Sequence, residues 1–197
     1  MSDNIYEAPQ AELVDGNIQQ KEYFIVSSKK LWLVNILTMG LYSVVWFYWH
    51  WRRIKHHDQS DIMPVWRAIF SVIFAYPLFL RIATEIDMKE LAHKFSAGVM
   101  ATCYIVLALG SYILSFLIDD TNSAHVLLST VLTVFTAVVS TFILSRAQNI
   151  VNDLCGDPQG SENAKFTLLN FVWMLLGLLV WLATFAGTMV LMSDASL

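Results

Sequence analysis

The chain has 197 residues, of which 56% are hydrophobic and only 14% are charged, and its mean hydropathy is +0.55. Soluble domains carry about 25% charged residues, so this composition excludes an ordinary soluble domain and indicates an all-α helical bundle in a lipid bilayer. The net charge of −4 is small, and no basic patch is interleaved with stacking aromatic residues. We therefore expect no nucleic-acid partner.

The N-terminal segment is acidic and rich in turn-forming residues. It has no basic stretch followed by an apolar one, so it does not read as a cleavable signal. We expect residues 1–22 to be a mobile, polar, cytosolic tail and residues 23–197 to form the membrane domain. The two cysteines, Cys103 and Cys155, match no disulfide framework and no CxxC site.

Five hydrophobic segments follow along the chain. The first, residues 31–51, has no formal charge and is long enough to cross a hydrocarbon core of ~30 Å. In the second, residues 62–82, two arginines and two prolines interrupt the apolar run, so it is a poorer span. Three clear spans complete the series, at residues 97–118, 124–144 and 166–192. The first two segments either span the membrane or re-enter it.

Two polar stretches adjoin these segments. RIATEIDMKELAHK, starting at Arg81, contains i,i+4 pairs of Arg81 with Glu85 and of Glu85 with Lys89. Its apolar residues, continued by Phe95, share one face, which predicts an amphipathic helix at the membrane surface. The fourth segment is expected to continue as a polar helix through SRAQNIVND.

The distribution of basic residues leaves two topologies open. With five simple spans and a cytoplasmic N-terminus, eight of the twelve Lys and Arg residues lie inside, but the densest cluster lies outside. If the first two segments each dip in and return, every basic residue lies on the cytoplasmic side. Gly40 and Pro77 are the expected breaks of these dips, which need protein or water to cover their irregular backbone.

The stretch WFYWHWRRIK and the arginine that follows it predict an interface with lipid headgroups. Amphipathic rings form belts at the membrane surface, and basic side chains next to them can meet phosphates. For the arginine of PVWRAIF we favour a snorkelling side chain or a structural ion pair over a ligand site. The predicted interface residues are Trp46, Trp49, Trp51, Arg52, Arg53, Lys55 and Arg67.

Small and hydroxyl residues on the later segments predict helix packing. They recur at helical spacing on the fourth segment, where Ala137 and Thr141 widen the stripe, and a small-xxx-small pair lies on the fifth. A polar pore lining is the alternative, but no charged residue lies on the stripe. The predicted packing residues are Ser129, Thr133, Thr136, Ser140, Ala183 and Gly187.

Metal binding and catalysis have little support. His50, His57 and Asp61 are spaced so that one helical face could hold all three, yet no known metal motif contains them. We favour a cluster of partly solvated polar residues. No nucleophile elbow, phosphate-binding loop or dinucleotide fingerprint is present, so we expect neither a catalytic site nor a cofactor.

Two adjoining stretches carry a family resemblance. FIVSSKKLWLVNILTMGLYSVVWFYWHWRRIK contains a TxGxYxxxWFYxxW signature, and MPVWRAIFSVIFAYPLF contains the PxxRAxF stretch that follows it. These resemble a bacterial family of multi-pass inner-membrane proteins of unknown function. SRAQNIVND and WMLLGLLVWLATFAG are similar to its closing part. The resemblance implies a Gram-negative inner-membrane protein and implies no substrate or catalytic residue.

Taken together, these observations favour a small non-enzymatic inner-membrane protein with its N-terminus in the cytoplasm. It would act as an interaction or scaffold component that contacts anionic lipid and either a membrane partner or further copies of itself. A small oligomeric transporter or channel that uses the hydroxyl stripe is the alternative. A membrane enzyme acting on lipid is less favoured, because no catalytic motif is present.

Overall fold

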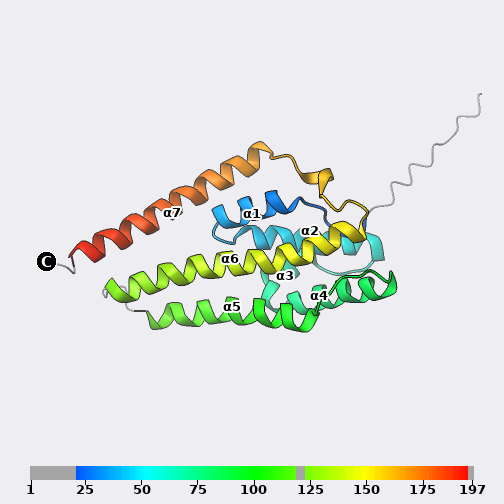
Figure 1. The fold of residues 1–197 in the computed structure, drawn as a ribbon, viewed down its shortest axis with the longest axis horizontal. Coiled ribbons are helices and arrows are strands. Elements are labelled where there is room, and N and C mark those ends of the chain that lie inside the picture. Colours follow the sequence, from blue (N-terminus) through cyan, green and yellow to red (C-terminus); the bar gives the residue numbers. More distant parts are fainter. Residues whose placement is uncertain (1–20, 119–122, 195–197) are drawn as a thin grey trace, which may run out of the picture.

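The computed structural model describes residues 21–118 and 123–194 (Figure 1). Its regular secondary structure is entirely helical within these ranges, which confirms the all-α class. The elements in chain order are α1 (Ser28–Leu37), α2 (Tyr42–Asp58), α3 (Pro64–Ile69), α4 (Ser71–Met88), α5 (Ala97–Leu117), α6 (Ser123–Leu154), the 3-10 turn η1 (Ser161–Asn163) and α7 (Leu168–Asp194).

Three helices of the described chain are long and apolar enough to cross a membrane: α5, α6 and α7. They coincide with the three predicted clear spans, and α6 continues to Leu154, which confirms the polar extension of the fourth segment. Few side chains in their apolar windows are buried within the bundle. Such surfaces need apolar surroundings, so the coarse prediction of a membrane bundle is supported.

The first hydrophobic segment is broken into two helices. Ser27 caps α1 by accepting a hydrogen bond from the backbone N–H of Lys30. The helix ends at Leu37, and the backbone passes through the left-handed region at Met39 and Gly40, with φ of 55° and 86°. The N–H of Gly40 donates to the carbonyl of Asn35 at 2.7 Å, a bond that closes the helix end. The predicted break at Gly40 is therefore found.

Contacts with α6 show that the chain reverses at this break. The carbonyl of Val26 bonds to Asn152, Asn35 bonds to Thr141, and Trp46 bonds to Gln148. The chain thus runs along α6 in one direction through α1 and returns through α2. We call α1 and α2 the first hairpin. Its two ends meet, because Lys21 and Arg53 both lie against Glu162, at 2.7 and 3.9 Å.

The second hydrophobic segment also reverses, but not at the predicted residue. Pro77 lies inside α4, and the break falls at Phe70, between α3 and α4. The Arg81 guanidinium binds the carboxylate of Asp58 at 2.6 Å, so the chain returns on α4 to the end at which it left α2. We call α3 and α4 the second hairpin, and the end of the bundle that holds Lys21, Arg53 and Arg81 the basic end (Figure 1).

The prediction of one amphipathic surface helix from Arg81 to Lys94 is wrong in part. The helix α4 ends at Met88, and residues 89–96 are not helical. Arg81 pairs with Glu22 and Asp58 instead of Glu85, whereas the predicted pair of Glu85 with Lys89 forms at 3.8 Å. Phe95 packs on Phe79, so it belongs to the core instead of sharing a face with Met88.

The structure describes only the end of the predicted N-terminal tail. Residues 1–20 lie outside the described residues. The last two residues of the tail are held in place, because Lys21 pairs with Glu162 and Glu22 pairs with Arg81. Lys21 and Glu22 are therefore part of the folded bundle.

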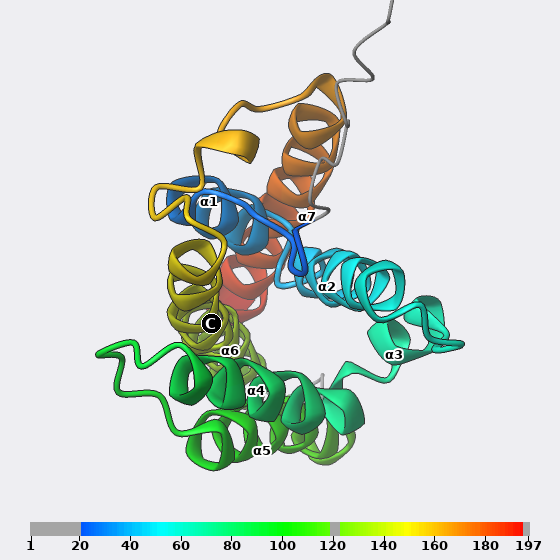
Figure 2. The same ribbon diagram turned by 90° about the vertical axis from the view of Figure 1, so that its right-hand side faces the viewer.

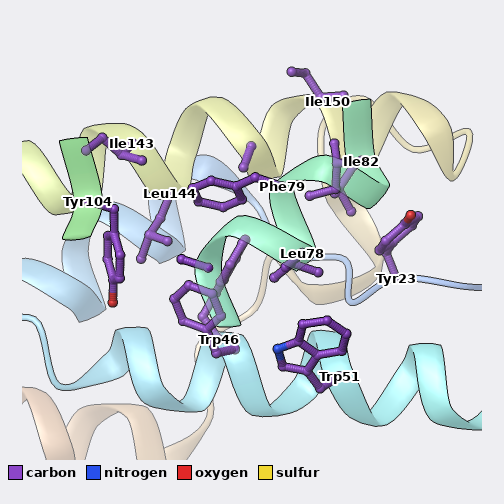
Figure 3. Packing of buried hydrophobic residues seen from close by; sticks show 14 of the residues in the cluster. Tyr23, Trp46, Trp51, Leu78, Phe79, Ile82, Tyr104, Ile143, Leu144 and Ile150 are labelled. Carbon is purple, nitrogen blue, oxygen red and sulfur yellow. The ribbon is translucent and has the colours of Figure 1, made fainter. Parts of the chain in front are cut away.

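The core lies where the two hairpins meet α6. Figure 3 shows Trp46 and Trp51 of α2, Leu78 and Phe79 of α4, and Leu144 of α6 pointing into one cluster. In the end-on view of Figure 2, α1 lies between α6 and α7, while α4 and α5 run side by side. The hairpins therefore pack against the long helices at the basic end. The far halves of α5, α6 and α7 extend beyond them.

Candidate functional site

A buried pair of amides joins the residues before α1 and the first hairpin to α6. The Gln148 side-chain oxygen accepts from Trp46 Nε1 at 2.6 Å, and its nitrogen donates to the Phe24 carbonyl at 3.0 Å and to Asn152 at 2.7 Å. Asn152 in turn donates to the carbonyl of Val26 at 3.0 Å. These bonds satisfy backbone carbonyls that have no sheet partner, so the pair is structural.

Burial corrects the predicted aromatic belt. Trp46 is fully buried and Trp51 is 3% exposed, so neither ring has surface for lipid headgroups. The prediction that these tryptophans lie at the membrane surface was wrong because an interfacial aromatic belt and a buried aromatic core have the same composition. Trp49 is half-buried and packs on Phe24, with ring centroids 5.9 Å apart. Of the three predicted tryptophans, only Trp49 retains appreciable exposed area.

The basic residues after the aromatic block do lie at the surface. Arg52 is exposed and its guanidinium lies 4.9 Å from the centre of the Trp49 ring, a cation–π contact. Arg53 and Lys55 are half-buried, and Arg53 approaches Glu162. We call Trp49, Arg52, Arg53 and Lys55 the aromatic–basic surface.

Arg67 stacks on aromatic rings and forms no ion pair within residues 21–118 and 123–194. Its guanidinium lies 4.2 Å from the centre of the Trp51 ring and 5.2 Å from that of Phe74. The predicted structural ion pair is thus absent from this part of the chain. Stacking leaves the planar N–H donors of the guanidinium available to a phosphate or to water.

The second hairpin surrounds Arg67 with exposed apolar side chains. They lie along α3 and the start of α4, and each is at least 47% exposed: Met63, Val65, Trp66, Ile69, Phe70 and Ile73. A contiguous apolar surface next to a stacked arginine is typical of a segment at the lipid interface.

The charged groups at the basic end form a clasp around Arg81. Its guanidinium donates to Glu22 at 2.6 and 2.8 Å and to Asp58 at the same two distances. The hydrogen bonds from Arg81 hold the pKa of the Asp58 carboxyl below its usual value. The clasp therefore ties three regions together: the residues before α1, the end of α2 and the second half of α4.

The metal trio considered for α2 is not assembled. His50 is fully buried, with its Nε2 3.3 Å from the Gln148 oxygen, so it faces the core instead of His57. Within the described residues, one different group brings ligand atoms within 4.8 Å of one another: Glu22, His57 and Asp58. Arg81 already engages both of its carboxylates, and a cation there would meet that positive charge.

The hydroxyl stripe on α6 contacts other helices less than expected. Ser129, Thr133 and Ser140 each donate to a carbonyl of their own helix. The hydroxyls that reach neighbours are Thr130, which bonds Thr188 at 2.9 Å, and Thr141, which accepts from Asn35. The packing face therefore coincides with the predicted stripe in part: the buried Ala137 and Thr141 belong to the widened stripe, whereas Thr130 does not.

Three stripe residues instead line a hollow. Thr133, Thr136 and Ser140 face a space of about 340 Å³, which the tip of the first hairpin at Gly40 and the α5 residue Ser111 also line. Thr133 and Ser140 donate to carbonyls of their own helix, so their oxygens can still accept hydrogen bonds from a molecule in this space.

The small pair predicted on α7 faces away from the bundle. Ala183 and Gly187 are exposed, and a Cβ on Gly187 would meet nothing within 4 Å. The helix packs instead through Gly177 and Trp181, whose Nε1 donates to the carbonyl of Ile36 at 2.9 Å. The prediction that Ala183 and Gly187 pack within the bundle is therefore wrong. Their role in an oligomer contact stays a prediction.

Comparisons of the chain with protein-family models, with curated proteins and with solved structures find no match. The geometry of the aromatic–basic surface, the clasp and the hydroxyl-lined hollow is therefore the basis for functional inference.

Proposed function

We propose that the chain is a non-enzymatic multi-pass membrane protein that acts as a scaffold at the inner leaflet of a bacterial inner membrane. The observation that carries this proposal is the placement of charge. All twelve Lys and Arg residues fall within residues 21–94 and 146–165, the parts of the chain that form or adjoin the basic end. The far parts of α5, α6 and α7 have no basic residue, and positive charge marks the cytoplasmic side.

In this arrangement α5, α6 and α7 cross the bilayer and both hairpins re-enter it from the cytoplasmic side. Irregular backbone at such depth requires internal partners. At the tip of the first hairpin, the Ile36 carbonyl accepts from Trp181, and the Thr38 hydroxyl donates to the carbonyl of Val34. The N-terminus then lies in the cytoplasm, which agrees with the topology that the basic residues favour.

The aromatic–basic surface is the proposed lipid contact. Arg52, Arg53 and Lys55 lie together on the last turns of α2, and Arg67 supplies a fourth cation on the next helix. Basic residues at the surface of an anionic leaflet contribute about 1 kcal/mol each to lipid attraction. The exposed faces of α5, α6 and α7, including Ala183 and Gly187, are the proposed contacts with a membrane partner or another copy of the chain.

The lipid contact can be tested by native mass spectrometry of the full chain with added phosphatidylglycerol. We expect replacement of Arg52, Arg53 and Lys55 by Gln to weaken phosphatidylglycerol binding by about tenfold or more. A matched control replaces Lys89, Lys94 and Arg146, which removes the same charge elsewhere. An equal effect of both triple variants would show that only net charge matters and would remove the role of this surface.

The hydroxyl-lined hollow favours a second function, that of a small oligomeric transporter or channel. A re-entrant tip that meets a hollow lined by hydroxyl groups is an arrangement suited to the passage of a small polar solute. Under this alternative, Thr133→Val and Ser140→Ala change solute flux into reconstituted vesicles. Absence of flux for every small solute tried with the unaltered chain would remove this alternative.

A further inference from the structure

The second hairpin carries a single cation within an exposed apolar face. The neighbours of Arg67 on α3, Trp66 and Ile69, are each 55% exposed, and the face continues across the turn to Phe70 and Ile73. Residues 62–80 contain no charged residue other than this arginine. In Figure 2, α3 lies at the edge of the bundle beside α2. We call these five residues the arginine face.

Aromatic rings, and not a carboxylate, hold the guanidinium of Arg67. It lies 4.2 Å from the centre of the Trp51 ring and 5.2 Å from that of Phe74. Among the described residues it has no ion-pair partner. Stacking occupies the flat sides of a guanidinium and leaves the N–H groups at its edge free to donate. The group is therefore oriented by the protein and still able to bind an oxyanion such as a phosphate.

Two helices place this guanidinium at the same depth. Trp51 lies seven residues before Asp58 on α2, and Phe74 lies seven residues before Arg81 on α4. Asp58 and Arg81 meet in the clasp, so Arg67 lies about 10 Å from the clasp along both helices. The headgroup layer of a leaflet is roughly 5–8 Å thick. With the clasp at the cytoplasmic surface, the guanidinium lies within reach of lipid phosphates, and the turn of the second hairpin lies among the acyl chains.

Lys55 supplies a second cation next to this position. It follows Trp51 by four residues on α2, so the two side chains lie on one face of the helix. Lys55 forms no ion pair with the part of the chain that the structure describes. The other two basic residues of α2 are engaged elsewhere, because Arg52 stacks on Trp49 and Arg53 approaches Glu162.

A cation next to an apolar surface is better matched by a glycerophospholipid than by a free phosphate. Inorganic phosphate can use the N–H donors of Arg67 but gains nothing from exposed hydrocarbon side chains. A glycerophospholipid offers a phosphate to the arginine and acyl chains to the apolar residues nearer the turn. The charge and the apolar area of the arginine face therefore fit one molecule.

We propose that the arginine face holds one glycerophospholipid, whose phosphate bridges Arg67 and Lys55 and whose acyl chain lies along Phe70 and Ile73. The inference rests on the proposed membrane function and deepens it by assigning a specific lipid to the second hairpin. Recognition is of the phosphate, so phosphatidylethanolamine binds here, and a glycolipid without a phosphate does not.

The test is native mass spectrometry of the full chain in mild detergent, with equal amounts of phosphatidylethanolamine and monoglucosyl diacylglycerol. The unaltered chain should retain the phospholipid in preference to the glycolipid. We expect Arg67→Gln to lower retention of phosphatidylethanolamine about tenfold, and Lys55→Gln to lower it about fivefold. The control Arg146→Gln removes one exposed cation from α6 and should leave retention unchanged.

A fluorescence measurement on the unaltered chain guards against misfolding of the variants. Phosphatidylethanolamine with brominated acyl chains should quench Trp66, and Trp66→Phe should remove the quenched component. An excess of phosphatidylethanolamine without bromine should restore the emission, whereas the same excess of the glycolipid or of inorganic phosphate should not. Restoration by inorganic phosphate would assign the arginine to a free anion and overturn the proposal. Equal retention of the phospholipid and the glycolipid would also overturn it.

Failure of this proposal is distinguishable from failure of the broader one. If Arg67→Gln retains the phospholipid while joint replacement of Arg52 and Arg53 releases it, the arginine face is removed and the aromatic–basic surface stays. Loss in Arg67→Gln alone keeps the arginine face and removes Arg52 and Arg53 as lipid contacts. Unchanged retention in both variants removes both proposals.

Discussion

The two hairpins are held to the bundle by different forces. The first is fixed by buried hydrogen bonds from Asn35, Trp46 and His50 to α6 and by close packing of α1 against α7. The second packs through apolar side chains such as Leu78 and Phe79, and the Arg81 clasp ties its helix α4 to Glu22 and to the end of α2. It leaves an apolar face exposed, whereas the first is enclosed on two sides.

The difference shows how a re-entrant segment can be positioned in two ways. Buried polar partners specify one register, because any other alignment leaves a donor or an acceptor without a partner. Apolar packing tolerates small shifts, so the second hairpin needs the clasp to fix the position of α4 relative to α2. We therefore expect the first hairpin to respond to single substitutions more strongly than the second.

The largest effect is expected at Gln148. Gln148→Leu keeps the side-chain size but leaves Trp46 Nε1 and the carbonyl of Phe24 without partners in the core. We expect a loss of about 3 kcal/mol in the free energy of unfolding, because several buried groups lose their partners together. Unfolding in mixed detergent measures it. Asn149→Ala, one residue along at an exposed position, is the control and should cost well under half as much.

The next effect concerns the contact between the first hairpin and α7. A Cβ on Gly177 would lie 2.0 Å from the carbonyl oxygen of Leu37 and 2.8 Å from its carbon, so the backbone must move. We expect Gly177→Ala to lower the thermal unfolding midpoint in detergent, at a cost of about 1–3 kcal/mol.

Gly187→Ala is the matched control for that substitution. It lies on the same helix and meets nothing within 4 Å, so alanine should leave stability unchanged or raise it. Equal destabilisation by both substitutions would contradict the close approach at Gly177. Disruption of an oligomer by Gly187→Ala alone would place the small pair of α7 at a subunit contact.

The smallest effect is expected in the second hairpin. Arg81→Gln breaks the clasp, and we expect a cost of about 1 kcal/mol, because the Asp58 side chain is 29% exposed and solvent screens the pair. The folded state lowers the pKa of Asp58, so its stabilisation is present above the unfolded pKa of ~3.9 and is lost as pH falls through the lower folded value.

A series of unfolding midpoints below pH ~5 measures this contribution. The unaltered chain should lose more stability over this range than the Arg81→Gln variant, because Asp58 in that variant no longer pairs with a guanidinium. Parallel pH profiles for the two proteins would show that the clasp does not carry the linkage.

The sequence predicted the elements that depend on local patterns. Length and apolar composition identified α5, α6 and α7, and the glycine of LTMGLYS marked the turn of the first hairpin. The second turn was placed wrongly at Pro77, because a proline removes only one helical bond and packing of Leu78 and Phe79 keeps α4 continuous.

The sequence did not predict the contacts of Trp46 and Arg81, because their partners lie far away in the chain. Trp46 is buried because Gln148, about a hundred positions later, offers it an acceptor, and no local pattern near Trp46 contains that information. The same holds for Arg81, whose partners Glu22 and Asp58 come from other elements. One signal was available: two of the three amides in SRAQNIVND, Gln148 and Asn152, are spaced i,i+4, so they share one face of the helix.

The central claim is that both hairpins return to the basic end, so that only three helices cross the membrane. Cysteine accessibility in sealed vesicles tests it directly, with Lys29→Cys, Arg53→Cys, Ser161→Cys and Ser193→Cys each made in a chain without Cys103 and Cys155. We expect an impermeant thiol reagent to label positions 29, 53 and 161 from the same side and position 193 from the opposite side. Labelling of position 53 from the side opposite to position 29 would show that the first segment spans the membrane, labelling of position 161 from the side opposite to position 53 would show that the second does, and either result would contradict the claim.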